Sequence, residues 1–190
     1  MEKHTPADEN DKAIQSISII RSLLNDDSFK NKHRTASKFF SRQFKLDFIT
    51  VVLLVLQKSI KPLQLVLNEF FKKLDNGVLV TKSAFTQARS HLKATAFVTL
   101  NKKAVLDVLY NDDNYEKAWG FRLLAIDGSK IHLPNTPEII QELGTIKFEA
   151  TVGNKKITGE HGYALASVMY DPLNKVIVDA CLAPAKASSG

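Results

Sequence analysis

The sequence predicts an α+β protein in which an all-helical N-terminal part precedes a short run of strands. Before about residue 118, apolar residues recur three or four positions apart, which is the spacing of one helix face. From Phe121 onward, short runs rich in β-branched and apolar residues ("FRLLAI", "YALASVMY" and "KVIVDACLA") indicate strands. We therefore divide the chain into a helical region, 1–118, and a strand-containing region, 119–190.

Five helices are expected in the first region. They cover residues 11–24, 46–56, 62–74, 81–92 and 97–110. The first should bury Ile14, Ile17, Ile20 and Leu24, which recur at helical spacing. The apolar run 46–56 is too long for a strand and indicates a buried helix, and Pro62 suits the first turn of the helix that follows.

The fourth helix is the candidate DNA contact. "DNG" at 75–77 is a turn signal, and Thr81 or Ser83 can cap the helix that follows. Phe85, Ala88 and Leu92 would face inward, and the outward candidates are Lys82, Gln87, Arg89 and Lys93. Two helices around a short turn are compatible with a DNA-binding helix-turn-helix, although such hairpins are common in any helical bundle.

Charge is concentrated in the middle of the chain. Residues 28–103 hold fifteen basic and three acidic side chains, a net charge of +12, whereas each flank carries −3. Such a basic block is expected of a surface that binds a polyanion, and solvated helical faces remain the alternative. Aromatic residues do not alternate regularly with the lysines, so stacking on a single strand is not specifically indicated.

The remaining composition indicates a cytoplasmic protein. Cys181 is the single cysteine, which excludes a disulfide framework and a cysteine-rich zinc site. The first residues lack the pattern of a secretory signal, and the most apolar window, 48–57, is far shorter than the ~20 residues of a spanning helix. No membrane partner is expected.

The strand region centres on "RLLAIDGSKIHLP", residues 122–134. We expect a strand that ends at Asp127, where the following glycine leaves the carboxylate open to a hard cation. An Asp-Gly pair is also a common turn, and metal-dependent phosphodiester chemistry needs two or three converging acids. His132 and His161 are further candidates for the same face, with surface histidines as the alternative.

A long connection, 135–162, is expected after this strand. Thr136 and Pro137 predict a short helix at its start, by capping and by filling the first helical position. The rest is punctuated by glycine, and its length indicates a functional or mobile segment. With Lys130, its Lys155 and Lys156 are counted among the candidate DNA contacts. A hairpin of "YALASVMY" and "KVIVDACLA" around "DPLN" would follow.

Taken in order, "KSAFTQARSHL", "YEKAWGFRLLAIDGSKIHLP" and "YALASVMYDPLNKVIVDACLAP" resemble the N-terminal half of the insertion-sequence-4 family of bacterial DDE transposases. The resemblance covers roughly residues 35–184. It implies a helical DNA-binding part followed by a ribonuclease-H-like catalytic domain, of which the first three strands are present. Asp127 matches the first metal-binding catalytic aspartate of the family.

The resemblance also implies Mg²⁺ or Mn²⁺ as cofactor in intact members, double-stranded DNA as partner, and a place at the bacterial nucleoid. The family's second aspartate and its glutamate have no counterpart in this chain, so weak or absent metal binding and no autonomous cleavage are expected. Asp179 is the first substitute to consider, although it lies within a strand, and Asp171 belongs to the hairpin turn.

Three functions remain open from the sequence. The chain is expected to be the N-terminal fragment of a transposase that cuts and joins DNA at element ends. Alternatively, it is a non-catalytic DNA-binding or regulatory product of a truncated element, which forms a homodimer or pairs with an intact copy. The third possibility, an unrelated helical interaction module with a small sheet, is disfavoured by the basic block.

Overall fold

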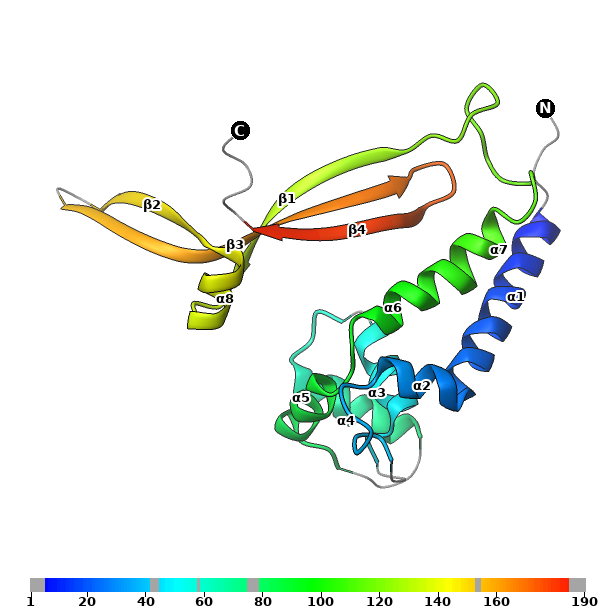
Figure 1. Cartoon of the computed structure of the whole chain (residues 1–190), viewed down its shortest axis with the longest axis horizontal. Helices are drawn as coiled ribbons and strands as arrows, with labels where there is room; N and C mark the ends of the chain where they lie inside the picture. The colour runs from blue at the N-terminus through cyan, green and yellow to red at the C-terminus, as the bar shows by residue number, and fades with distance from the viewer. Residues whose placement is uncertain (1–5, 42–44, 58, 75–78, 153–154, 185–190) are drawn as a thin grey trace. The chain divides into compact units, whose positions relative to one another are not determined.

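The computed structural model describes residues 6–41, 45–57, 59–74, 79–152 and 155–184 (Figure 1). Contacts group the chain into two compact units, Met1–Asn111 and Asp112–Gly190. We call them the helical unit and the sheet unit and describe each by itself. Helices dominate the first and antiparallel strands the second, so the α+β class predicted from the sequence is confirmed.

The helical unit contains the five expected helices and one that the sequence did not reveal. Their bounds are α1 Pro6–Asn25, α2 Asp27–His33, α3 Phe48–Leu56, α4 Leu63–Lys73, α5 Lys82–Ser90, α6 Thr95–Leu100, η1 Asn101–Leu106 and α7 Asp107–Leu109. The last three follow one another without a break, and η1 is a π-helical stretch. The unexpected helix is the short α2, which begins where Asp26 accepts the Ser28 N–H at 2.8 Å.

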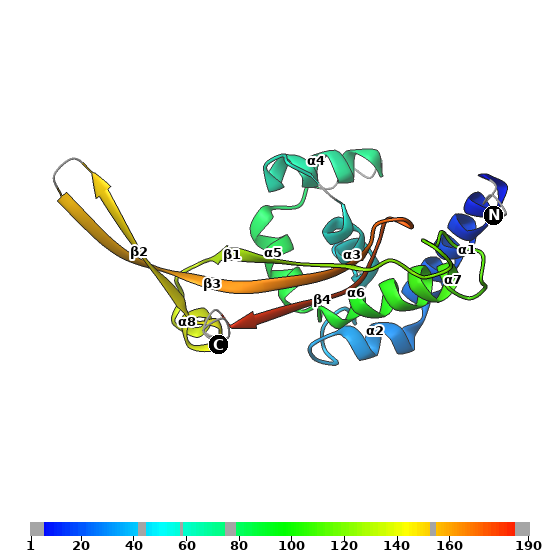
Figure 2. The same cartoon turned by 90° about the horizontal axis from the view of Figure 1, so that it is seen from above.

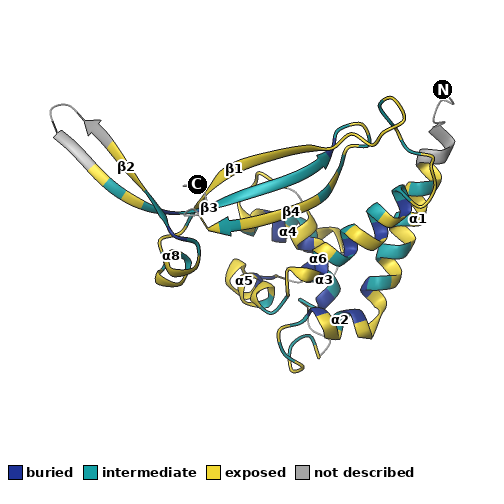
Figure 3. Ribbon diagram, turned by 45° about the horizontal axis from the view of Figure 1, so that its top comes forward, coloured by how far each residue is buried: buried dark blue, intermediate teal, exposed yellow. Residues whose placement is uncertain are grey.

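Two apolar clusters form the core of this unit, and α3 contributes to both. Phe48 and Val52 belong to the cluster that joins α1, α2 and α6. Val51 and Leu54, on the other side of the same helix, belong to the cluster with α4 and α5. Figure 3 shows the buried residues gathered on these helices. The helix predicted at 46–56 is therefore present as α3, and its burial is confirmed in part: Phe48, Val51, Val52 and Leu54 are buried, whereas Leu53, Val55 and Leu56 are exposed.

One prediction for α1 was wrong. Ile20 and Leu24 pack in or against the core, but Ile14 and Ile17 are each 57% exposed. The side of α1 that meets the rest of the unit is marked by Lys12, whose Nζ donates to the Leu109 carbonyl oxygen at 3.1 Å. At ~100° per residue, Ile14 lies on the far side of the helix from Lys12. Ile17 is close in angle to the core residue Leu24 but lies about two turns earlier, and the α1 residues that join or pack against the core are Ile20, Leu23 and Leu24.

The sheet unit is built around one long strand. The elements are β1 Ala125–Leu133, α8 Pro137–Leu143, β2 Thr145–Val152, β3 Lys155–Asp171 and β4 Val176–Pro184. The C-terminal half of β3 pairs antiparallel with both β1 and β4, and its N-terminal half pairs antiparallel with β2. Figure 2 shows β2 and β3 continuing as a two-stranded ribbon.

The predicted β3–β4 hairpin is confirmed, and a buried carboxylate closes it. Asp171 is fully buried and accepts the backbone N–H groups of Leu173 and Asn174 at 3.1 and 3.0 Å. It also accepts the Asn174 side-chain amide at 2.9 Å. Asp171 thus has a structural role in the turn, as its position in "DPLN" predicted.

The long connection predicted at 135–162 is only partly irregular. Its short helix is confirmed as α8, which Thr136 caps and Pro137 begins. The glycine-punctuated remainder is instead the β2–β3 ribbon. Gly159 fits within β3 because its partner Phe148 lies over it: a Cβ on Gly159 would come within 2.2 Å of the Phe148 ring. Glycine here marks a close approach rather than a loop.

Candidate functional site

Asp127 lies inside a strand, which corrects the expectation that the strand ends at this residue. It is the third residue of β1, which continues to Leu133. The Asp-Gly-Ser tract stays extended because it pairs with Val168, Ser167 and Ala166 of β3. Asp127 is exposed, and its Oδ1 accepts the N–H of Gly128 at 2.8 Å.

The register divides the polar residues of β1 between two faces. Residues paired across antiparallel strands point to the same side, and successive residues alternate. Asp127 therefore shares its face with Val168 of β3 and Ala180 of β4. Lys130 and His132 lie on the opposite face, so neither assists Asp127.

Neither of the other acids considered for this site joins Asp127. Asp179 pairs with Met169, the residue next to Val168, and therefore lies on the opposite face of the sheet. Asp171 is used by the hairpin turn. Within the described residues, no three His, Cys, Asp or Glu side chains are close enough to hold a metal ion. The residues present supply one carboxylate ligand, which by itself does not fit the needs of two-metal chemistry.

His132 and His161 lie together, but in an aromatic cluster away from Asp127. Their ring centroids are 4.7 Å apart. Phe148 stacks on His161 at 4.8 Å, and Tyr163 lies edge-on to His132 at 5.2 Å. The sequence suggested that both histidines share a face with Asp127. They share a face with each other instead, since His132 pairs with Tyr163 and His161 is two residues before it in β3.

The polar face predicted for the helix at 81–92 is present on α5. Thr81 caps the helix by accepting the Ala84 N–H at 3.2 Å, while Phe85 is buried. The four outward candidates Lys82, Gln87, Arg89 and Lys93 are all exposed. At ~100° per residue, Lys82 and Arg89 lie close together on one side of the helix. Gln87 lies toward the other side of its exposed face. No acidic residue occurs in this helix.

Gln64 of α4 sets the start of α5. Its side-chain Nε2 donates to the Val80 carbonyl oxygen at 2.9 Å, and its Oε1 accepts the Lys82 N–H at 2.9 Å. The connection spans residues 74–81, which is longer than the three or four residues of a helix-turn-helix turn. The "DNG" signal at 75–77 lies outside the described residues. Gln64 thus joins α4 to the start of α5 through its side-chain amide.

The C-terminal end of α5 adjoins the end of α2. The Lys93 N–H donates to the His33 carbonyl oxygen at 2.8 Å, and the Thr35 N–H donates to the His91 carbonyl oxygen at 2.9 Å. Lys93 Nζ reaches the Lys32 carbonyl oxygen at 3.3 Å. These contacts place the exposed cations of two helices next to each other, which raises the positive potential at this end of α5.

His33 is buried beneath this basic end. It is 1% exposed, its Nδ1 is 2.9 Å from Thr95 Oγ1, and its ring is 4.5 Å from that of Phe29. Within the described part of the chain, its Nε2 has no hydrogen-bond partner. Burial, together with the nearby positive charges of Lys32 and Lys93, lowers the pKa of His33 below its usual value.

The predicted DNA contacts are thus divided between the units. Lys82, Gln87, Arg89 and Lys93 lie in the helical unit, while Lys130, Lys155 and Lys156 lie in the sheet unit. Lys155 and Lys156 begin β3, opposite Val152 and Thr151. Lys82, Gln87 and Arg89 of the first group lie on α5 and Lys93 follows that helix, whereas Lys155 and Lys156 lie at the start of a strand.

Sequence reasoning missed a hollow beside α5. Lys38, Phe39 and Lys45 line it from one side, and Gln87 and His91 from the other. Aromatic rings and lysines lie together here through the fold, because Phe39 stacks on a histidine fifty-two positions away in the sequence. Because these residues are distant in the sequence, the absence of regular alternation between aromatic residues and lysines did not reveal such a site.

The last findings concern the chain as a whole. Among the described residues, no helix combines the length and the apolar character needed to cross a membrane. Comparisons with family models, curated proteins and solved structures find no match to this chain.

Proposed function

We propose that the helical unit binds duplex DNA and that α5 is the element that contacts it. The observation that carries this proposal is the exposed face of α5, which presents Lys82, Gln87 and Arg89 without any acid in the helix. Lysine and arginine neutralise phosphates, and a glutamine amide can read an adenine edge. The basic end shared with α2 extends the surface along a phosphate backbone.

The resemblance to the insertion-sequence-4 family suggests the larger activity. In this proposal the chain carries the DNA-binding part and the beginning of a ribonuclease-H-like domain of a DNA transposase. The antiparallel order β1–β3–β4 supports it, since these would be the first three strands of that fold. Asp127, exposed on the first of them, would contribute one carboxylate ligand to a Mg²⁺ or Mn²⁺ ion, and the further ligands would have to come from elsewhere.

The second candidate is a DNA-binding or regulatory protein that does not cut DNA. The opposite orientation of Asp127 and Asp179 favours it, because these two acids of the chain do not converge on one metal. In both candidates the 190-residue chain alone binds DNA, with duplex DNA as its first partner and a second copy or an intact transposase as a further one. Cleavage is what distinguishes them.

Salt-dependent binding of a mixed-sequence duplex tests the proposal. Each neutralised phosphate releases condensed counterions, so log affinity should fall linearly with log salt concentration with a slope of roughly −0.9 per contact. Fluorescence anisotropy of a labelled duplex, titrated at several salt concentrations, measures the slope. Absence of binding at low salt, or an affinity indifferent to salt, would overturn it.

A further inference from the structure

The hollow beside α5 has the size and the lining of a ligand site. Its volume is about 770 Å³, within the ~300–1,000 Å³ range of small-molecule pockets. One wall is the side of α5 that carries Ala84, Gln87 and Ala88, and the other is formed by Lys38–Ser41 together with Lys45 and Leu46. Only Gln87 of these residues belongs to the DNA contacts already proposed.

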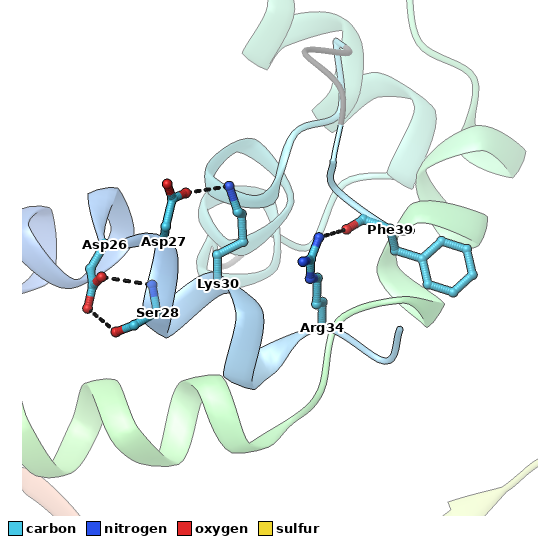
Figure 4. A network of polar contacts seen from close by, with 6 residues as sticks. All are labelled: Asp26, Asp27, Ser28, Lys30, Arg34 and Phe39. Atoms are coloured by element: carbon cyan, nitrogen blue, oxygen red, sulfur yellow. Dashed lines mark hydrogen bonds and ion pairs between the residues drawn. The ribbon is translucent and has the colours of Figure 1, made fainter. Parts of the chain in front are cut away.

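An aromatic pair in this hollow is held in place by backbone contacts. The rings of Phe39 and His91 are parallel within 8°, with centroids 3.4 Å apart. The Phe39 carbonyl oxygen accepts Arg34 Nη1 at 2.8 Å (Figure 4), and the His91 carbonyl oxygen accepts the Thr35 N–H at 2.9 Å. Because both residues are fixed in advance, a ligand that stacks here loses little free energy to ordering them.

Phe40 keeps the neighbouring backbone in a demanding conformation. Its φ is +55°, a region that bulky residues rarely adopt and that costs on the order of 1–3 kcal/mol. Its ring packs edge-on against Phe48 of the core at 5.6 Å. The core thus holds Phe40, while the preceding Phe39 stacks on His91 at the hollow.

The charged and polar groups of the hollow define the chemistry of its occupant. Lys38 and Lys45 line it, and no carboxylate is found among its described lining residues. Lys38 Nζ lies 5.2 Å from the centre of the Phe39 ring. Gln87 adds an exposed carboxamide that both donates and accepts hydrogen bonds. The complementary ligand is anionic, flat and aromatic, with hydrogen-bonding atoms on its edge.

We propose that this hollow binds a single nucleotide. The base lies in the apolar part against the Phe39–His91 pair, Gln87 bonds to the base edge, and Lys38 and Lys45 neutralise the phosphate. Stacking of bases on aromatic side chains tolerates any base, since every base has a π face. The nucleotide is either an unpaired residue of a DNA strand, which rests on the proposed function, or a free nucleotide.

Three probes separate these sources. The first is a blunt, fully paired duplex, and the second is the same duplex with one unpaired nucleotide at one end. The third is free dAMP, titrated directly by calorimetry and as a competitor of the second. We expect the full-length chain to bind the duplex with the unpaired nucleotide roughly tenfold more tightly than the blunt duplex, as base stacking on aromatic residues allows.

Two variants assign this preference to the hollow. His91→Ala removes the stacking partner, and Phe39→Leu keeps apolar volume without an aromatic face. In each variant, the ratio of the affinity for the duplex with the unpaired nucleotide to that for the blunt duplex should fall to about one, while the affinity for the blunt duplex stays unchanged. Arg89→Ala, on the other flank of α5, is the matched control, and it should weaken both duplexes equally. Circular dichroism melts establish that the variants are folded.

A preference that both variants abolish supports the proposal. If dAMP does not remove that preference, the hollow takes a strand-borne nucleotide, and if excess dAMP removes it, the hollow takes nucleotides from either source. dAMP binding without any preference assigns the hollow to the free nucleotide. The proposal is overturned if the chain shows no preference for the unpaired nucleotide and does not bind dAMP. It is also overturned if both variants keep the preference. Both conclusions hold even when the blunt duplex binds. If no duplex binds at low salt, the proposed function fails, and dAMP calorimetry on wild type and His91→Ala still decides the hollow.

Discussion

Asp127 and Asp179 lie on opposite faces of the same sheet, because their partners Val168 and Met169 are consecutive residues of β3. The two acids were the only pair in the strand region considered able to share a metal. A β-strand alternates its side chains, so a shift of one residue in register is enough to separate them. Asp127 therefore has to obtain any second carboxylate from elsewhere.

This relationship predicts the metal chemistry of the isolated chain. Mn²⁺ should bind on the order of millimolar or more weakly, since one carboxylate leaves most of the charge of a divalent ion unbalanced. Nicking of supercoiled DNA in Mn²⁺ should be undetectable, and Asp127→Asn and Asp179→Asn should both leave duplex affinity unchanged. Calorimetry with Mn²⁺ and a plasmid nicking assay measure these. Nicking that disappears in Asp127→Asn would contradict the expected inactivity.

Asp127 is also expected to contribute little to stability. Its Oδ1 accepts a hydrogen bond from the N–H of the next residue, and its side chain is exposed. Asp127→Asn should preserve an acceptor and shift the free energy of unfolding negligibly. Asp127→Ala should cost at most about 0.5–1.5 kcal/mol, the worth of one hydrogen bond. Thermal melts of both variants decide whether the acid is a turn-type cap, for which a larger loss in the alanine variant is expected.

The proposed DNA surface predicts unequal effects of lysine and arginine substitutions. Replacing Arg89 and Lys93 by alanine should weaken duplex binding and flatten the slope of log affinity against log salt by roughly two phosphate contacts. Replacing Lys155 and Lys156 should have a smaller effect, because they belong to the start of β3 and not to the α5 surface. Equal losses in the two double variants would show that α5 is not the reader.

The spacing of apolar residues was sufficient to predict the helices whose apolar faces pack against the core. The run around Val51 and Val52 is apolar on several sides, which is what a helix shared by two clusters requires. For α1 the periodicity was present but misleading, since Ile17 repeats the helical position of the core residue Leu24 and is still exposed, as is Ile14. Pattern alone does not say where along a helix a neighbour covers its apolar side.

The candidate sites show a different limit. Which faces Asp127 and Asp179 occupy depends on pairing with β3, across a long insertion that contains a second hairpin. The stack of Phe39 on His91 depends on α2, α5 and the segment after α2 meeting in three dimensions. Thr81 and Thr136, by contrast, act within three residues of themselves. The sequence predicted the Thr136 cap correctly and offered Thr81 as one of two candidates, with Ser83 as the other.

Gln64 is expected to be important for both stability and DNA binding. Gln64→Ala removes its two hydrogen bonds to the Val80 and Lys82 backbone, which should cost about 1–3 kcal/mol of unfolding free energy. Because these bonds fix the start of α5, duplex affinity should fall as well. Gln64→Glu keeps the acceptor for the Lys82 N–H but loses the donor to Val80, so an intermediate melt is expected. Urea unfolding and anisotropy on the same samples test the link, and an unaltered affinity in a destabilised Gln64→Ala would separate the two roles.

The buried His33 predicts that the helical unit loses stability in mild acid. Burial lowers the pKa of His33 in the folded chain, so the unfolded chain takes up its proton first as the pH falls. Stability should therefore be highest above the unfolded pKa of about 6.5 and decrease as the pH falls from there through the folded pKa.

The charged groups around His33 reinforce this direction. Lys32 and Lys93 are the positive neighbours that oppose protonation, so a protonated His33 would add a third charge next to them. Melting temperatures of the wild type between pH 7.5 and 5 should fall more steeply than those of His33→Gln, which keeps a polar side chain opposite Thr95 but does not titrate. Asp26, whose pKa is lowered by its hydrogen bonds to Ser28, loses its stabilising charge only at more acidic pH and does not contribute in this window. Parallel melting curves for His33→Gln and wild type would show that another group carries the acid sensitivity.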